Sequence, residues 1–147
     1  MLEIIGNLWD YAYKENFRIC ITTNGFVKSN GECVMGRGCA LEAKERYPQL
    51  PKLLGNSITA YGNKLNLIYL PDTFLVSFPV KHHWKEQADI NLIKKSAESL
   101  NWLSTIHPHL TFILPKPGCG NGSLNWNNVK KVIEPILNDK IIIIDRY

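Results

Sequence analysis

Several features common in functionally identified proteins are absent from this sequence. It has no apolar run of the roughly 20 residues needed to cross a bilayer, so a membrane-spanning helix is excluded. It has neither a GxGxxG dinucleotide fingerprint nor the Gly-Lys-Ser/Thr of a P-loop. The four cysteines form no CxxC pair, and the adjacent His82 and His83 have no further ligand at a recognised spacing. We therefore expect reduced thiols, no metal site and no cofactor.

Charge of either sign is not concentrated anywhere in the chain. The 17 basic and 13 acidic residues give a net charge of +4, and the basic residues are scattered. This balance suits an anionic ligand but not a long nucleic-acid stripe. The opening segment, MLEIIGNLWDY, carries acid rather than the basic flank of a signal peptide. We expect a cytoplasmic protein with a single domain over residues 1–147.

The apolar pattern predicts an α/β fold. Short apolar runs predict strands at residues 2–5, 17–22, 57–61, 66–70, 73–78, 110–114 and 140–145. Helical spacing predicts helices at residues 39–47, 90–105 and 126–137, and a short helical piece at residues 53–54 that Gly55 closes. Asn125 is the expected N-cap of the last helix, and Pro135 should kink its final turn. Strands alternate with helices in the second half, which favours a mixed or mostly parallel sheet covered on both faces.

A glycine-rich loop, PKPGCGNGSLNW at residues 115–126, lies between a predicted buried strand and a predicted helix. Gly118, Gly120 and Gly122 occupy every second position, and Ser123 adds a hydroxyl donor. Strand, glycine loop and helix together can present backbone N–H groups and a helix N-terminus to an anion. A tight turn without a ligand is the alternative reading.

Three polar or glycine-rich stretches each follow directly on a predicted strand, at residues 23–38, 79–85 and 115–125. They are longer than the two to about six residues that a plain connection needs. Because ligands of open α/β sheets bind outside the carboxyl ends of the strands, we expect these stretches to converge on one cleft with a phosphate site.

The same three stretches resemble the macrodomain family, which binds ADP-ribose. The matching segments are TTNG at residues 22–25 with VMGRGCA at 34–40, FPVKHHW at 78–84, and GCGNGSLNW at 118–126. Of the branches of this family, the antitoxin type, which removes ADP-ribose from thymidine in DNA, is the most similar. The terminal ADP-ribose glycohydrolase of animals and stand-alone phage macrodomains are also similar. The resemblance implies a three-layer α/β/α sandwich with a central mixed, mostly parallel sheet of about six strands.

The resemblance also implies a role for individual residues. Asn7 stands where an aspartate usually accepts a hydrogen bond from the adenine amine, Asn24 should contact the distal ribose, and Lys81 should be needed for hydrolysis. A lysine there can act as a nucleophile or protonate the leaving group. The predicted catalytic residues are Lys81 and Asn24, and the predicted ligand-binding residues are Asn7, Leu8, Asn24, Val34, Met35, Gly36, Arg37, Gly38, Pro117, Gly118, Cys119, Gly120, Asn121, Gly122 and Ser123.

One departure separates the chain from the animal branch. Gly122 replaces the aspartate that resolves the lysine adduct there. The leading interpretation is an ADP-ribosyl hydrolase. The alternatives are a reader or sponge that binds ADP-ribose or an NAD-derived nucleotide without turnover, and an ADP-ribose-1''-phosphate phosphatase. The expected partner is ADP-ribose or ADP-ribosylated DNA or protein, with no membrane; the sequence does not fix an oligomeric state, and we expect a monomer.

Overall fold

A six-stranded sheet forms the centre of the molecule. The computed structural model describes residues 1–146; Tyr147, the last residue of the expected domain, lies outside the described residues. The strands are β1 (Leu2–Ile5), β2 (Phe17–Asn24), β3 (Asn66–Tyr69), β4 (Phe74–Lys81), β5 (Thr111–Pro115) and β6 (Ile141–Asp145). Their order across the sheet is β1-β6-β5-β2-β4-β3.

All neighbouring strands run parallel except β3 and β4, which are antiparallel. Five strands therefore end at the same edge of the sheet. The predicted mixed, mostly parallel sheet of about six strands is confirmed.

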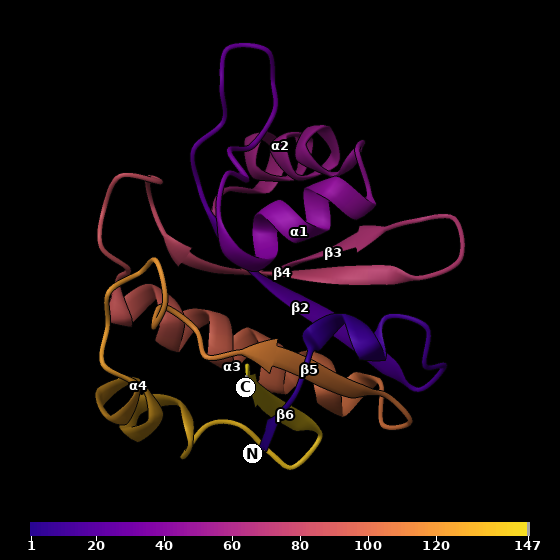
Figure 1. The fold of residues 1–147 in the computed structure, drawn as a ribbon, viewed down its shortest axis with the longest axis vertical. Helices are drawn as coiled ribbons and strands as arrows, with labels where there is room; N and C mark the ends of the chain where they lie inside the picture. Colours follow the sequence, from indigo (N-terminus) through magenta and orange to yellow (C-terminus); the bar gives the residue numbers. More distant parts are fainter. Residues whose placement is uncertain (147) are drawn as a thin grey trace.

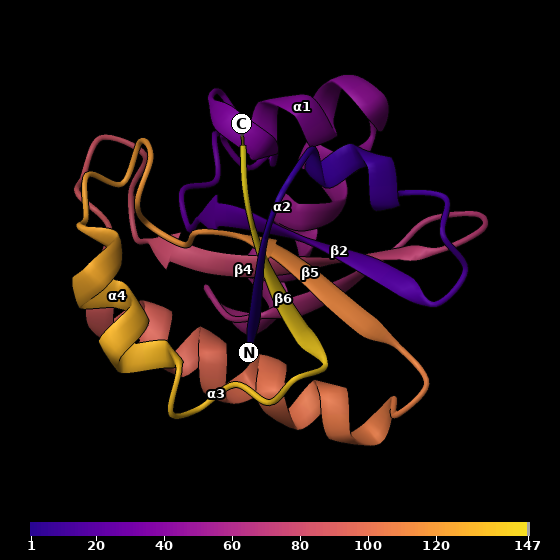
Figure 2. The ribbon, with the colours of Figure 1, turned by 60° about the horizontal axis from the view of Figure 1, so that its bottom comes forward.

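Helices cover both faces of the sheet. They are the short 3₁₀ helix η1 (Leu8–Tyr11), α1 (Gly38–Arg46), α2 (Leu50–Tyr61), α3 (Ile90–Ile106) and α4 (Trp126–Ile133). Figure 1 shows α1 and α2 on one side of the sheet and α3 and α4 on the other, and Figure 2 shows the same three layers from another direction. One hydrophobic core packs α3 and α4 against the sheet, and a second core packs α1, α2 and η1 against the opposite face. The predicted three-layer sandwich is thereby confirmed.

Two sequence-based expectations about local structure are wrong. Residues 57–61, expected as a strand, form the last turns of α2, which also runs through Gly55 instead of closing there. The helix continues because Leu50 and Leu54 are buried and Ile58, one turn further, packs on the same core. Helix α4 ends at Ile133, so Pro135 follows the helix and does not kink it. Within residues 1–146, no helix is both long and apolar enough to cross a membrane.

Candidate functional site

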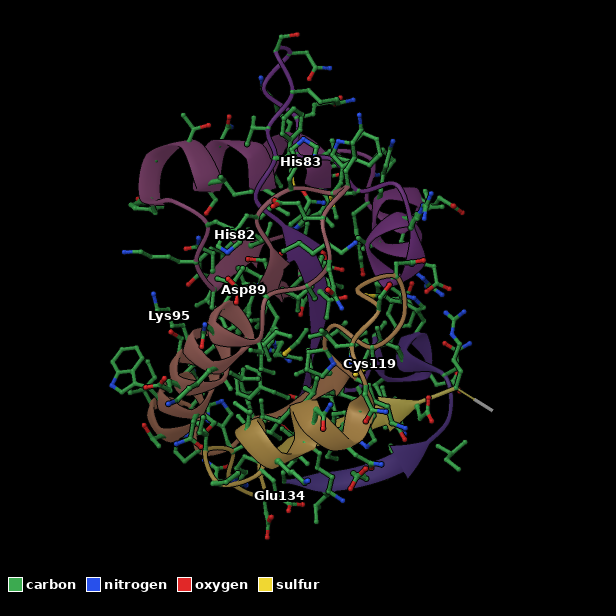
Figure 3. The ribbon with its side chains drawn as sticks, turned by 90° about the vertical axis from the view of Figure 1, so that its left-hand side faces the viewer. His82, His83, Asp89, Lys95, Cys119 and Glu134 are labelled. Atoms are coloured by element: carbon green, nitrogen blue, oxygen red, sulfur yellow. The ribbon has the colours of Figure 1, made fainter. Side chains whose placement is uncertain are left out.

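A large cavity lies along the carboxyl edge of the five parallel strands. It has a volume of about 1190 Å³, and we call it the edge cavity. Its walls include residues at the ends of β2, β4, β5 and β6 and in the turn after β1. Figure 3 looks onto this edge of the molecule, where His83 marks the β4–α3 loop and Cys119 marks the glycine loop between β5 and α4. The expected convergence of the strand ends therefore occurs.

The ends of β2 and β4 place Asn24 beside Lys81. The two strands pair in regular register up to Thr23 and Pro79, and a bulge then makes Asn24 the partner of Lys81 instead of Val80. Pro79 lies at this irregularity, beyond the last residue of β4 that pairs with β3, so the missing N–H of proline breaks no ladder there. Both Asn24 and Lys81 line the edge cavity.

Hydrogen bonds fix the Lys81 ammonium between two loops. Its Nζ donates to the carbonyl of Asn121 at 3.1 Å and to that of Trp84 at 3.4 Å. Partial burial lowers the pKa of Lys81 below its ordinary value, and repulsion from the Arg37 guanidinium lowers the pKa further. A larger fraction of Lys81 is therefore neutral at a given pH than for a solvated lysine, and only the neutral amine is a nucleophile.

The glycine loop holds its own shape and leaves several amides unused. Leu124 N–H donates to the Gly118 carbonyl, Ser123 N–H donates to the Gly120 carbonyl, and Gly118 has a φ of +77° that favours glycine. Within residues 1–146, the backbone N–H groups of Gly120, Asn121 and Gly122 donate to no protein acceptor. The three residues line the edge cavity, and the loop leads into the N-terminus of α4. Unused amides next to a helix N-terminus suit a phosphate.

A second loop faces the glycine loop across the cavity. The Asn24 side chain shapes it, since its amide donates to the Val34 carbonyl at 2.9 Å and its oxygen accepts from Phe26 N–H. The loop leads into α1, whose first residue, Gly38, has a φ of +59°. A Cβ atom on Gly38 would lie 3.3 Å from Nδ2 of the Asn121 side chain, so the two loops nearly touch.

The edge cavity carries an excess of positive charge. Lys116 pairs with Asp145 at 2.8 Å, and Arg146 pairs with Glu42. Arg37, Lys81 and Lys85 also line the cavity, and within residues 1–146 none of the three pairs with a carboxylate. The unpaired cations favour an anionic ligand.

Most of the predicted site residues line the edge cavity. These are Leu8, Asn24, Val34, Met35, Gly36, Arg37, Gly38, Lys81, Gly118, Cys119, Gly120, Asn121 and Gly122. Asn7 is not among the lining residues; it is exposed, and its side-chain oxygen caps η1 by accepting from Trp9 N–H at 3.0 Å. Pro117 is buried and is not among the lining residues. Ser123 lines a smaller hollow of about 610 Å³ that adjoins the edge cavity, which we call the side hollow.

Other residues of the lining were not predicted. Thr22, Lys116, Trp126, Asp145 and Arg146 all line the edge cavity. A usable signal existed for Asp145, because it ends a predicted apolar strand and the carboxyl ends of parallel strands meet at one edge. Lys116 and Trp126 flank the glycine motif itself.

The cysteines near the cavity are poor nucleophiles. Burial raises the pKa of the Cys39 thiol, and it raises that of Cys119 to about 11. A thiol with a raised pKa carries little thiolate near neutrality. Neither thiol is therefore a good candidate for a nucleophile. Among residues 1–146, no group of three His, Cys, Asp or Glu side chains could hold a metal ion.

Comparisons with known proteins agree with this geometry. No family model matches the chain. The chain is 26% identical over 105 residues to the DNA ADP-ribosyl glycohydrolase of Mycobacterium tuberculosis, covering 67% of this chain and 30% of that protein. It is 25% identical over 111 residues to that of Thermus aquaticus, covering 71% and 31%. The chain thus spans about a third of the length of these curated relatives.

Solved structures show the same fold. The macrodomain of Thermus aquaticus DarG aligns with a TM-score of 0.73 at 23% identity over 99% of this chain and 96% of that one. The macrodomain of Mycobacterium tuberculosis DarG aligns with a TM-score of 0.71 at 22% identity over 96% and 97%. Thermosipho africanus DarTG in complex with ADP-ribose aligns with a TM-score of 0.78 at 18% identity over 99% and 42%. The chain has the macrodomain fold and is related to the macrodomains of DarG-type DNA ADP-ribosyl glycohydrolases.

Proposed function

We propose that the protein binds ADP-ribose in the edge cavity and hydrolyses ADP-ribosyl linkages with Lys81. The observation that carries this proposal is the position of the Lys81 amine, which lines the edge cavity and donates to the Asn121 carbonyl in the glycine loop. A distantly related structure was solved in complex with ADP-ribose. Curated relatives are named DNA ADP-ribosyl glycohydrolases.

The proposed chemistry uses the neutral Lys81 amine. Nζ attacks the anomeric carbon of the distal ribose, the bond to the leaving group breaks, and one amine proton goes to that group. The second amine proton goes to the ring oxygen as the ribose opens, which leaves an imine. Water then adds to the imine carbon, the carbon–nitrogen bond breaks, and ADP-ribose and the free amine are regenerated. The transition state of the first step, in which the bond to the leaving group breaks, is oxocarbenium-like, as in other glycoside cleavages.

A reader without turnover is a second candidate, and one observation favours it. The segment from Gly118 to Asn125 contains no carboxylate, and Gly122 stands where the animal enzymes that the chain resembles carry an aspartate. Without a base there, hydrolysis of an adduct depends on another group or on solvent. A reader would tolerate the loss of Lys81, whereas a hydrolase would not.

The test is direct. The protein is incubated separately with ADP-ribosylated DNA, ADP-ribosylated protein and ADP-ribose-1''-phosphate, and the products are separated. Release of ADP-ribose from DNA or protein supports the proposal. Release of inorganic phosphate alone would contradict the proposal and indicate a phosphatase that acts on ADP-ribose-1''-phosphate. If calorimetry shows binding of ADP-ribose but no substrate is turned over, the result would support the reader function instead.

A further inference from the structure

The end of β4 extends beyond its neighbour β3. Strand β3 begins at Asn66, whose partner on β4 is Ser77, so residues 78–81 of β4 lie past the start of β3. Continuing the antiparallel register backwards from Asn66 brings Asn63, in the turn between α2 and β3, level with this strand end. A turn residue therefore lies beside the end of β4 in place of a strand.

Donors from outside the sheet bind the carbonyls at the end of β4. The Val80 carbonyl accepts from the N–H of Asp89, the N-cap of α3, at 2.8 Å. The Lys81 carbonyl accepts from Nδ2 of Asn63 at 2.9 Å. Because an unpaired backbone carbonyl away from water costs free energy, these two bonds fix the path by which the chain leaves the sheet. The bond from Asn63 is made to Lys81 itself.

Asn63 also packs against the end of β2. A Cβ atom on Gly25 would lie 2.6 Å from Cγ and from Nδ2 of Asn63, so only a glycine leaves room for this side chain. Gly25 directly follows Asn24, the last residue of β2 and the register partner of Lys81 across the bulge. One side chain therefore lies against both strands of the bulge.

The donor of Asn63 is the property that this position uses. The reverse orientation of the amide would place its oxygen against the Lys81 carbonyl oxygen, so the bond to Lys81 fixes the orientation. Within residues 1–146, the Asn63 Oδ1 atom is buried and has no hydrogen-bond partner. An apolar side chain of the same size would not incur the cost of that buried acceptor. Packing alone therefore does not account for an asparagine here.

We propose that Asn63 is a positioning residue for Lys81, which holds the bulge between β2 and β4 and thereby directs the Lys81 amine to the glycine loop. This inference rests on the proposed function. Asn63 is not among the residues that line the edge cavity, so it acts through Lys81 and not on the ligand. The amine in turn donates to the Asn121 carbonyl. Misplacement of a reacting group by about 1 Å can cost roughly 100-fold in rate.

The test compares Asn63→Asp with Asn66→Asp in the full chain. Asn63→Asp keeps the size of the side chain but sets an acceptor against the Lys81 carbonyl. On whichever ADP-ribosylated substrate the wild-type protein consumes, we expect kcat to fall about 10- to 100-fold. Calorimetry should give an ADP-ribose Kd within about threefold of wild type at unchanged stoichiometry. A loss of folded protein alone would lower kcat and the binding stoichiometry together.

Asn66→Asp is the matched control. It removes an amide donor at the start of β3, just after the same turn, where Asn66 Nδ2 donates to the Lys64 carbonyl at 3.3 Å, away from the bulge. This variant should change neither kcat nor the ADP-ribose Kd. If Asn63→Asp kept the kcat of the wild-type protein, or if Asn66→Asp lowered kcat as much, the inference would be overturned.

A double-mutant cycle tests the contact with Gly25. Gly25→Ala should displace the Asn63 side chain and lower kcat. Asn63→Gly should lower kcat as well, and adding Gly25→Ala to it should lower kcat no further, because the colliding side chain is gone. If the two effects multiplied instead, the residues would act independently and the inference would be overturned.

Hydrogen–deuterium exchange separates this inference from the proposed function, because it needs no turnover. Asn63→Asp should speed exchange in the peptides that contain the ends of β2 and β4, and Asn66→Asp should not. Unchanged exchange at both strand ends would overturn the inference. A wild-type protein that consumes no ADP-ribosylated substrate would overturn the proposed hydrolysis and the catalytic part of the inference. Faster exchange in Asn63→Asp would then still support the structural part, that Asn63 holds Lys81.

Discussion

Asn24 and Lys81 are register partners across β2 and β4, and a bulge after Thr23 makes them so. In unshifted register Asn24 would pair with Val80, and Lys81 would lie one residue further along. The bulge therefore makes two residues from distant parts of the sequence backbone neighbours at the edge cavity, which both of them line. Bulges often occur next to active sites for this reason.

The first prediction concerns Lys81→Ala. We expect turnover to be lost while ADP-ribose binding stays within about tenfold, or about 1.4 kcal/mol. The glycine-loop amides already serve the diphosphate, so one cation adds little to ground-state binding, whereas the nucleophile acts only in the reaction. Turnover is measured on an ADP-ribosylated substrate, and binding by calorimetry. Lys81→Arg is the matched control, because it keeps the charge but not the nucleophile. Full turnover by either variant would place the chemistry on another residue.

The second prediction concerns pH. If the neutral amine reacts, kcat/KM should rise with pH as Lys81 loses its proton. Arg37 repels the protonated form, so Arg37→Gln should raise the pKa of Lys81 and move this rise to higher pH. Lys28→Gln is the control, because Lys28 lines the same cavity and does not shift the pKa of Lys81. If kcat/KM of the Arg37→Gln variant rose at the same pH as that of the wild-type protein, the titrating group would not be Lys81.

The third prediction separates binding from folding in the glycine loop. A Cβ atom on Gly120 would meet nothing within 4 Å, whereas one on Gly122 would lie 2.5 Å from the Gly118 carbonyl oxygen. Gly120→Val should therefore change the free energy of unfolding by less than about 0.5 kcal/mol. It should weaken ADP-ribose binding by more than about 100-fold, or roughly 2.7 kcal/mol, because the valine fills the phosphate site. Gly122→Val should instead lower stability by about 1–3 kcal/mol. Normal binding by a folded Gly120→Val protein would mean that the loop only connects two elements.

The sequence predicted much of the architecture because apolar runs mark buried strands. All six strands of the sheet fall on such runs, and the long polar stretches after three of them lie at one edge because parallel strands end together. The pairing of Asn24 with Lys81 could not be predicted in this way. It depends on a one-residue shift that leaves no mark in the apolar pattern.

Asn7 shows a second limit. Its position at the end of β1 was predicted, but the direction of its side chain was not. The side-chain oxygen that was expected to accept from adenine also caps η1, and since it has a second lone pair the contact with adenine stays a prediction. Whether an asparagine side chain caps the following helix depends on the local backbone conformation. The sequence of the turn alone does not fix the direction of that side chain.

The prediction of a strand at residues 57–61 was wrong because Gly55 was interpreted as the end of a helix. Glycine closes many helices, since it tolerates a left-handed conformation at the C-terminus. Gly55 is in the middle of α2 for a different reason. A Cβ atom there would lie 1.9 Å from the carbonyl oxygen of Gly31, so the helix and the β2–α1 loop approach too closely for any side chain.

The last prediction tests that contact with Gly55→Ala. On an exposed helix face, this change would stabilise the protein by about 1 kcal/mol, because alanine has the higher helix propensity. At Gly55 the new methyl group collides with backbone, so we expect a net loss of about 1–3 kcal/mol. Displacement of Gly31 would also strain the bond from Cys33 N–H to the Pro51 carbonyl, which anchors the loop leading to Val34. ADP-ribose binding should weaken as a result.

The matched control is Asn56→Ala, at the neighbouring, exposed position of α2. It gains helix propensity without a collision, so its free energy of unfolding should stay the same or rise slightly. Thermal and urea unfolding of both variants give the comparison. If Gly55→Ala were as stable as Asn56→Ala, the close approach of α2 to Gly31 would be wrong, and the loop at residues 31–38 would have to be held by its other contacts alone. If Gly55→Ala lost stability but bound ADP-ribose normally, the helix contact would support the fold without positioning the binding loop.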